Sequence, residues 1–75
     1  MEFSGRVIAK PFAVGSKSER TGVYLVTDRG EFLLRRREAN PFHDPVLEDL
    51  AGSRIRCEGE LHGYTIIMSS YDLIA

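Results

Sequence analysis

The chain has 75 residues and a balanced charge, with ten Lys and Arg against eleven Asp and Glu and a net charge of −1. A chain this short forms one domain, over 1–75, and has no room for a second domain or a deep substrate cleft. The balanced charge weighs against a general nucleic-acid binder, whose affinity needs a basic excess, unless a local basic patch supplies it.

The first half of the chain predicts three strands. Residues 3–12 form a long first strand, with Gly5 as a bulge or bend of the kind that lets a small barrel curve. Residues 15–22 are polar and bounded by glycines, which predicts a loop flanking a binding face. Residues 23–27 and 31–37 form the next two strands, joined by the hairpin signal Asp-Arg-Gly.

Residues 44–52 carry the clearest local signals, those of one short helix. Asp44 is a strong N-cap, because its carboxylate can accept hydrogen bonds from the first turn, and Pro45 suits the first helical position. Gly52 can adopt the left-handed conformation that ends a helix. The helix should close the open end of a barrel with its apolar side chains, which are Val46, Leu47 and Leu50.

Apolar and charged residues alternate most clearly at residues 54–61, which predicts a half-buried strand. The face expected in the core carries Ile55, Cys57, Gly59 and Leu61. His62 and Gly63 then turn the chain into a fifth strand at 64–70, which is followed by a terminal segment at 71–75.

One short helix between the third and fourth strands of an all-β chain predicts a five-stranded OB-like Greek-key barrel. An SH3-like barrel is the alternative, which the capped helix fits less well. Strand patterns, turns and caps all agree with a single fold. We expect the domain to be a monomer or a weak dimer.

The third strand determines which surface is available for binding. Phe32 and Leu34 share an apolar face that should enter the core, which places Leu33, Arg35 and Arg37 outside. The simplest interpretation is that the three consecutive arginines only keep a strand end soluble.

The neighbours of this outer set depend on the turn before it. A three-residue Asp-Arg-Gly loop places Val23 and Leu25 outside, whereas a two-residue Arg-Gly turn places Tyr24 and Val26 outside instead, because a shift of one residue exchanges the two faces. We favour the three-residue loop, since a type I turn followed by a left-handed glycine suits Asp-Arg-Gly.

The two registers predict different partners. An aliphatic patch rimmed by arginine suits a protein or peptide, with Leu33 as the anchor and Arg35 and Arg37 binding carboxylates, and this is our leading hypothesis. With Tyr24 outside, the face can instead stack a base and hold phosphate, which predicts single-stranded nucleic acid as the alternative partner. The residues that would bind it are Tyr24, Arg35, Arg36 and Arg37.

No catalytic or metal-binding pattern is present. His43 and His62 lack ligands at metal-binding spacing, and Cys57, the one cysteine, alternates with core residues and should be a buried apolar side chain. The chain has neither a run of about 20 apolar residues nor the order of a signal peptide. We therefore expect a cytoplasmic, non-catalytic binding module without metal, cofactor or membrane contact.

Over roughly residues 22–63 the chain resembles a class of short bacterial proteins of OB-fold type whose function is unknown. The resemblance is carried by GVYLVTDRGEFLLRR and above all by NPFHDPVLEDLAG. Because bacterial OB-type proteins often bind single-stranded nucleic acid, the resemblance implies such a role by analogy. It implies no particular site residue.

Overall fold

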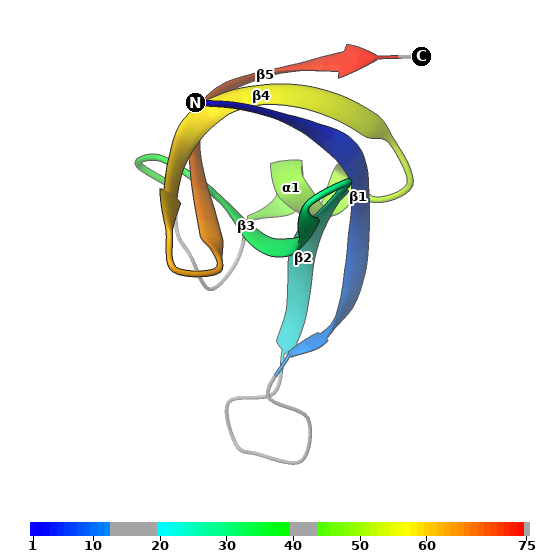
Figure 1. Cartoon of the computed structure of the whole chain (residues 1–75). Coiled ribbons are helices and arrows are strands. Elements are labelled where there is room, and N and C mark those ends of the chain that lie inside the picture. Colours follow the sequence, from blue (N-terminus) through cyan, green and yellow to red (C-terminus); the bar gives the residue numbers. More distant parts are fainter. Residues whose placement is uncertain (13–19, 40–43, 75) are drawn as a thin grey trace.

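A computed structural model describes residues 1–12, 20–39 and 44–74. Across these residues the elements are β1 (Glu2–Phe12), β2 (Arg20–Thr27), β3 (Gly30–Arg36), α1 (Pro45–Asp49), β4 (Arg54–His62) and β5 (Thr65–Ile74). The predicted order is confirmed, with one short helix between the third and fourth strands (Figure 1).

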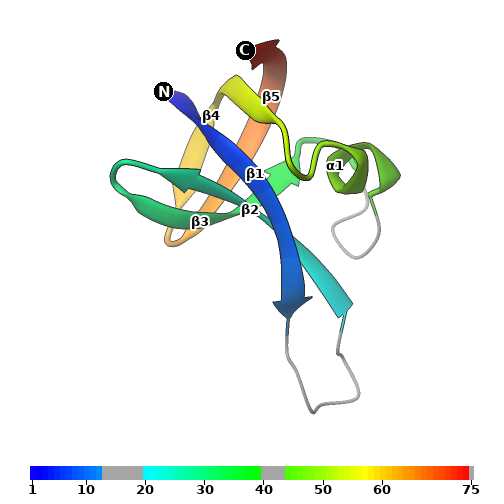
Figure 2. The ribbon, with the colours of Figure 1, turned by 90° about the vertical axis from the view of Figure 1, so that its right-hand side faces the viewer.

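The strands close into a barrel in the order β1-β2-β3-β5-β4. β1 pairs antiparallel with both β2 and β4, and β3 pairs parallel with β5, which completes the circle. Each of the five strands therefore pairs with two neighbours. The predicted fold class, an all-β chain with one short helix in a five-stranded barrel, is confirmed, and the barrel is consistent with an OB-like or an SH3-like fold. In Figure 2, α1 lies at one end of the barrel and the β2–β3 and β4–β5 turns lie at the other.

The core fills the barrel with inward-facing side chains of all five strands, together with Leu47 of α1 and Leu50 at its C-cap. These buried residues are Phe3, Val7, Val23, Leu25, Leu34, Leu47, Leu50, Ile55, Cys57, Ile66 and Met68. Phe32 packs against this core, so the predicted inner face of β3 is confirmed. Cys57 is buried as predicted, and burial raises the pKa of its thiol. Leu61 is wrongly predicted as core, because it lies near the end of β4 and is 38% exposed.

The helix is capped as predicted. The carboxylate of Asp44 accepts from the backbone N–H groups of Val46 at 3.2 Å and Leu47 at 3.5 Å. Gly52 has φ +91°, and its N–H donates to the carbonyl of Val7, which ties the end of the helix region to β1. The prediction that Val46 packs inward is wrong: it is 38% exposed, because it lies beside the stripe of buried leucines rather than on it.

Of the bulge or bend predicted at Gly5, the bulge is wrong, and Gly5 is a point where two backbones approach closely. It pairs regularly with Ile55, and a Cβ atom there would lie 2.0 Å from the carbonyl oxygen of Val26. Within the described strands, the ladder shifts instead between Glu58 and Gly59 of β4, opposite β5. The strand continues through this irregularity, so the predicted terminal segment at 71–75 is part of β5 as far as Ile74.

The observed pairing of β2 with β3 shows that the favoured prediction, a three-residue loop, is wrong. Thr27 pairs with Gly30 across a two-residue turn, and Tyr24 pairs with Leu33. The hydroxyl of Thr27 closes this turn, since it accepts from the N–H of Arg29 at 3.0 Å and donates to the carbonyl of Gly30 at 2.9 Å. The turn lies one residue earlier than the Arg-Gly alternative, but it exposes the same face.

Burial agrees with this register. Val23 and Leu25 are 7% and 0% exposed, whereas Val26 is 38% exposed and Tyr24 is half-buried. The prediction that Val23 and Leu25 lie outside is therefore wrong. This register buries two purely aliphatic side chains and keeps the hydroxyl of Tyr24 out of the apolar core, where it would need a hydrogen-bond partner.

Candidate functional site

One row of side chains crosses the outside of the barrel over three strands. Ile8 of β1 pairs with Tyr24 of β2, which in turn pairs with Leu33 of β3. All three are half-buried on the side of the sheet opposite the core. We call Ile8, Tyr24 and Leu33 the central row. It presents one aromatic ring between two aliphatic side chains.

Basic residues lie on both sides of the central row. Arg6 and Lys10 are two residues before and after Ile8 on β1, and Arg35 is two residues after Leu33 on β3. Two residues along a strand span about 7 Å, so a cation lies roughly that far from the row in either direction. We call the central row and these three cations the outer face.

This face is locally basic although the chain as a whole is not. On the outer face three cations, Arg6, Lys10 and Arg35, stand against one acidic residue, Glu31. The other described acidic residues lie outside this face, among them Glu58 and Glu60 of β4, Asp72 of β5, and Asp44, Glu48 and Asp49 in and beside α1. The barrel therefore provides the local basic patch that the net charge of −1 conceals.

Lys10 links the ring and the acidic residue of this face. Its ammonium group lies 4.6 Å from the centroid of the Tyr24 ring and forms an ion pair with Glu31. The side chains of that pair are 46% and 37% exposed. Exposed pairs contribute about 0–1 kcal/mol, so a ligand can displace Lys10 from the ring at little cost.

Arg35 and Arg36 have different surroundings. Arg35 points outward with Leu33 and makes no ion pair with any described residue. Arg36 instead donates two hydrogen bonds of 2.8 Å to the carboxylate of Asp44. The hydrogen bond from Arg36 lowers the pKa of Asp44, and the same bond raises the pKa of Arg36. The guanidinium of Arg36 thus supports the helix cap rather than the outer face.

Arg37 follows β3 and is held by β4 and β5. Its N–H donates to the carbonyl of Met68 at 2.9 Å, and its guanidinium lies 3.7 Å from the carboxylate of Glu60. His62 also contacts Glu60 at 3.1 Å, and this contact lowers the pKa of Glu60, with Arg37 adding to the effect. The nearby hollow of about 300 Å³ is lined by Arg36, Arg37, Met68, Ser69, Ser70 and Tyr71. Both of its arginines are already paired.

Sequence reasoning missed part of the face. Ile8 and Lys10 join it only through the pairing of β1 with β2, which no local pattern reveals. Tyr64 was assigned to a strand, but it lies in the two-residue Gly63–Tyr64 turn, is 82% exposed, and its carbonyl accepts from the N–H of Leu33 at 2.8 Å. Gly63 has φ +61°, and a glycine at the first position of a two-residue hairpin turn is the sequence signal that could have placed Tyr64 in the turn rather than in a strand.

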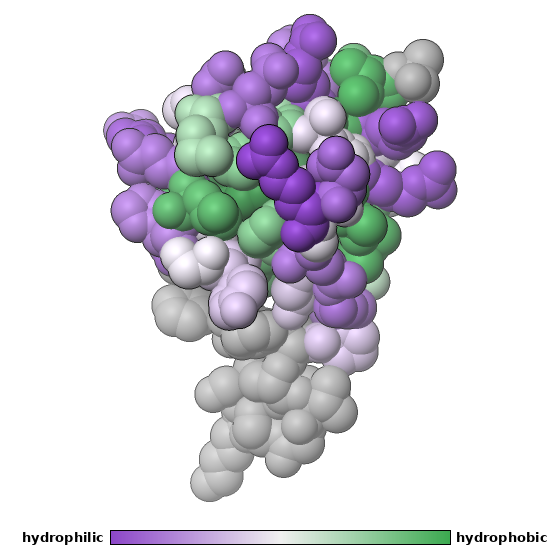
Figure 3. Space-filling view, viewed as in Figure 1, coloured by the Kyte–Doolittle hydropathy of each residue, from purple (hydrophilic) through white to green (hydrophobic). Residues whose placement is uncertain are grey.

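Apolar and charged side chains are interleaved at the end of the barrel that carries the two hairpin turns. In Figure 3, hydrophobic areas lie there between strongly hydrophilic side chains.

Among the described residues, no helix is long and apolar enough to cross a membrane, and no three His, Cys, Asp or Glu side chains gather as metal ligands. His43 and residues 15–19 of the predicted loop lie outside the described residues, whereas residues 20–22 belong to β2. Comparisons with protein-family models, curated proteins and solved structures found no match to this chain.

Proposed function

We propose that this protein is a non-catalytic module that binds single-stranded nucleic acid on its outer face. The observation that carries the proposal is the outward position of Tyr24, beside Leu33 and between two sets of basic residues. This arrangement favours single-stranded nucleic acid, which the sequence alone predicted only as the alternative partner. In OB-type barrels, strands 2 and 3 with the loops between strands 1–2 and 4–5 bind oligonucleotides, which gives support by analogy.

A single strand fits this face in a simple way. One base stacks on the ring of Tyr24, an interaction worth about 1–3 kcal/mol per base, while the ribose or a neighbouring base covers Leu33. The phosphates on either side reach Arg35 and Lys10 in one direction and Arg6 in the other. Stacking requires an unpaired base, so duplexes should bind more weakly than single strands. Affinity should depend little on sequence, because every base offers a flat face.

Lys10 exchanges partners in this mechanism. In the free protein it covers the ring of Tyr24 and pairs with Glu31. When a base replaces it on the ring, its ammonium group is free to turn toward a phosphate. Glu31 is then the one acidic group of the face without its partner, so it limits affinity and keeps binding reversible.

The proposal further places the protein in the bacterial cytoplasm, as a monomer or weak dimer without enzyme activity, metal or cofactor. The bacterial assignment rests on the resemblance of residues 22–63 to short bacterial proteins.

A protein or peptide remains the second candidate partner. Its supporting observation is the aliphatic content of the same surface, where Val26 is 38% exposed in addition to Ile8 and Leu33. If a protein is the partner, Leu33→Asp should abolish its capture while the melting temperature stays near that of the wild type. Retained capture by this variant would exclude the face as a protein-binding site.

Fluorescence anisotropy with labelled, mixed-sequence single-stranded DNA and RNA tests the leading proposal. We expect binding at low salt that weakens as salt increases, because cations are released from the phosphates that the protein neutralises. Arg35→Gln should weaken binding and reduce the slope of log affinity against log salt by about 0.7, the value for one phosphate of a single strand. Arg56→Gln is the matched control, because it removes the same charge from β4, which contributes no residue to the outer face. Arg56 lies there 3.8 Å from Glu2.

Two results would contradict the proposal. Failure of the wild type to bind at low salt, where charge attraction is least screened, would remove nucleic acid as the ligand. Equal loss of slope in Arg35→Gln and Arg56→Gln would mean that total charge, not this face, governs binding.

A further inference from the structure

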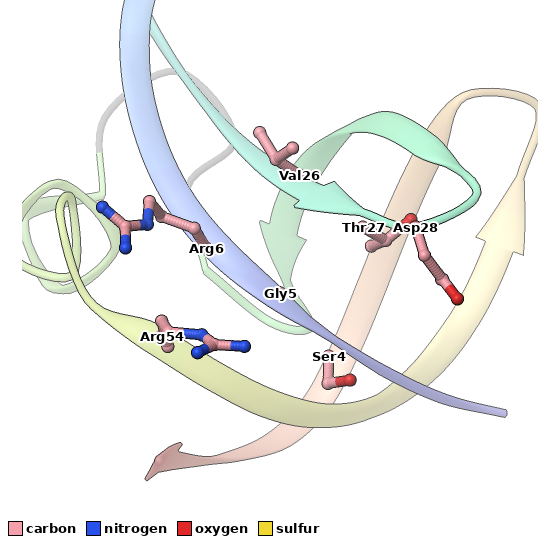
Figure 4. Close-up of a pocket in the computed structure, with 7 residues that line it drawn as sticks. All are labelled: Ser4, Gly5, Arg6, Val26, Thr27, Asp28 and Arg54. Carbon is pink, nitrogen blue, oxygen red and sulfur yellow. The ribbon is translucent and has the colours of Figure 1, made fainter. Parts of the chain in front are cut away.

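A second feature, a hollow of about 380 Å³, lies next to the outer face (Figure 4). It is lined by Ser4, Gly5, Arg6, Val26, Thr27, Asp28 and Arg54. We call it the notch. It forms where β1 leaves β2: Arg6 still pairs with Val26 of β2 and also with Arg54 of β4, whereas residues 2–5 pair only with β4.

The notch brings two uncompensated positive charges together. Arg6 and Arg54 are direct cross-strand partners, and neither makes an ion pair with any described residue. Like charges directly opposite each other on antiparallel strands destabilise a sheet. The other exposed arginine on β4, Arg56, has an acidic partner in Glu2. Arg6 and Arg54 therefore stand opposite each other without an acidic partner among the described residues, which leaves both guanidinium groups available to an anion.

The remaining polar groups of the notch agree with an anionic ligand. The hydroxyl of Ser4 makes no hydrogen bond to a described residue and can donate one, while that of Thr27 is occupied in the turn. Asp28 is the one acidic residue of the lining. Figure 4 shows its carboxylate at the far side of the notch, directed away from the guanidinium groups of Arg6 and Arg54. Guanidinium groups bind phosphate oxygens through paired hydrogen bonds.

We infer that the notch binds a phosphate monoester, and that in the complex this group is the terminal phosphate of a bound single strand. The inference rests on the proposed function, because Arg6 belongs both to the notch and to the outer face. A terminal phosphate carries more negative charge than an internal one, which matches two adjacent arginines better than one. The strand then begins in the notch and crosses the ring of Tyr24 about 7 Å further along β2.

Competition with unlabelled oligonucleotides tests this inference. Three oligonucleotides of one sequence carry a 5′-phosphate, a 3′-phosphate or hydroxyl groups at both ends, and each displaces an internally labelled probe. For the wild type, one phosphorylated form should compete roughly five- to ten-fold better than the hydroxyl form, as expected for charge-assisted hydrogen bonds at a surface. Arg54→Gln should abolish this advantage, and Arg56→Gln, which removes the same charge two residues along β4, should keep it.

The results separate this inference from the proposed function. If all three oligonucleotides bind the wild type equally well, the terminal-phosphate inference is overturned and nucleic-acid binding stands. If no oligonucleotide binds, the proposed function fails. A titration of isotope-labelled protein with inorganic phosphate then tests whether the notch binds phosphate by itself. Shifts of the Arg6 and Arg54 side-chain NMR signals would then support a site for free phosphate, and unchanged signals would overturn the notch as a phosphate site.

Discussion

Replacing Asp44 by Ala tests how the helix is fixed to the barrel. The Asp44 carboxylate has two roles: it accepts from the N–H groups of Val46 and Leu47, and it receives two hydrogen bonds of 2.8 Å from Arg36. The variant removes both at once. It also leaves the guanidinium of Arg36 without its carboxylate partner, at a position where the side chain is only 33% exposed.

The expected cost follows from the cap. Loss of an Asp N-cap costs about 1 kcal/mol, within a range of roughly 0.5–2 kcal/mol. The helix has five residues, so it has little stability of its own, and it holds Leu47 and Leu50 in the core at 4% and 7% exposure. We therefore expect a loss of about 1–2 kcal/mol. For a domain of this size each kcal/mol corresponds to about 4–8 °C in melting temperature.

Thermal unfolding followed by circular dichroism measures this change. Asp44→Asn separates the two roles, because Asn caps helices as well as Asp does but lacks the charge that pairs with Arg36. It should unfold at a temperature between those of the wild type and Asp44→Ala. Asp49→Ala is the control, since Asp49 is exposed at the last helical position. A melting temperature of Asp44→Ala equal to that of the wild type would refute the role assigned to the cap.

Three further predictions concern stability. Because Arg36 lowers the pKa of Asp44, that stabilisation is present above the ordinary carboxyl value of 3.8 and is lost as pH falls below it; urea unfolding from pH 6 to pH 2 should show this loss in the wild type but a shallower one in Asp44→Asn. Gly59→Ala places a Cβ 2.4 Å from the carbonyl oxygen of Ile67 and should cost about 1–3 kcal/mol in chemical unfolding; an unchanged midpoint would contradict the close approach. Arg54→Glu replaces repulsion with attraction opposite Arg6 and should stabilise the protein by about 0.2–1 kcal/mol; a lower melting temperature would show that the two arginines do not oppose each other.

Local chemistry was enough to predict the helix and the order of the strands. Asp44, Pro45 and Gly52 each signal their position through their own conformation or hydrogen-bonding capacity, so no distant contact is needed. The alternation of β4 predicted Ile55 and Cys57 as core residues for the same reason. It failed at Leu61 because the end of a strand need not lie inside the barrel.

The outer face could not be predicted because it depends on registers between strands. Residues 23–26 are all good strand formers, and both of their faces are largely apolar. The residue types alone therefore do not show which face is exposed to solvent. In the structure the hydroxyl of Thr27 bonds across a turn that ends at Arg29, so β3 begins at Gly30 rather than at Glu31. Arg36 illustrates the same limit, since three consecutive arginines look alike until the position of Asp44 in space is known.

The notch was beyond sequence reasoning for a related cause. Arg6 and Arg54 are 48 positions apart in the chain and meet only because β1 pairs with β4. Each alone is an ordinary exposed arginine on an alternating strand. Their proximity, and the lack of an acidic partner among the described residues, becomes visible only when the barrel is closed.

The most direct test of the central claim compares Tyr24→Leu with Tyr24→Phe in anisotropy titrations with single-stranded DNA at low salt. Both variants keep an apolar side chain at the half-buried position, but only Phe keeps an aromatic ring. Because stacking on one base contributes about 1–3 kcal/mol, Tyr24→Leu should bind at least about five-fold more weakly than the wild type, whereas Tyr24→Phe should bind within about two-fold of it. Wild-type affinity in Tyr24→Leu, or equal losses in both variants, would contradict the proposal that nucleic acid stacks on this face.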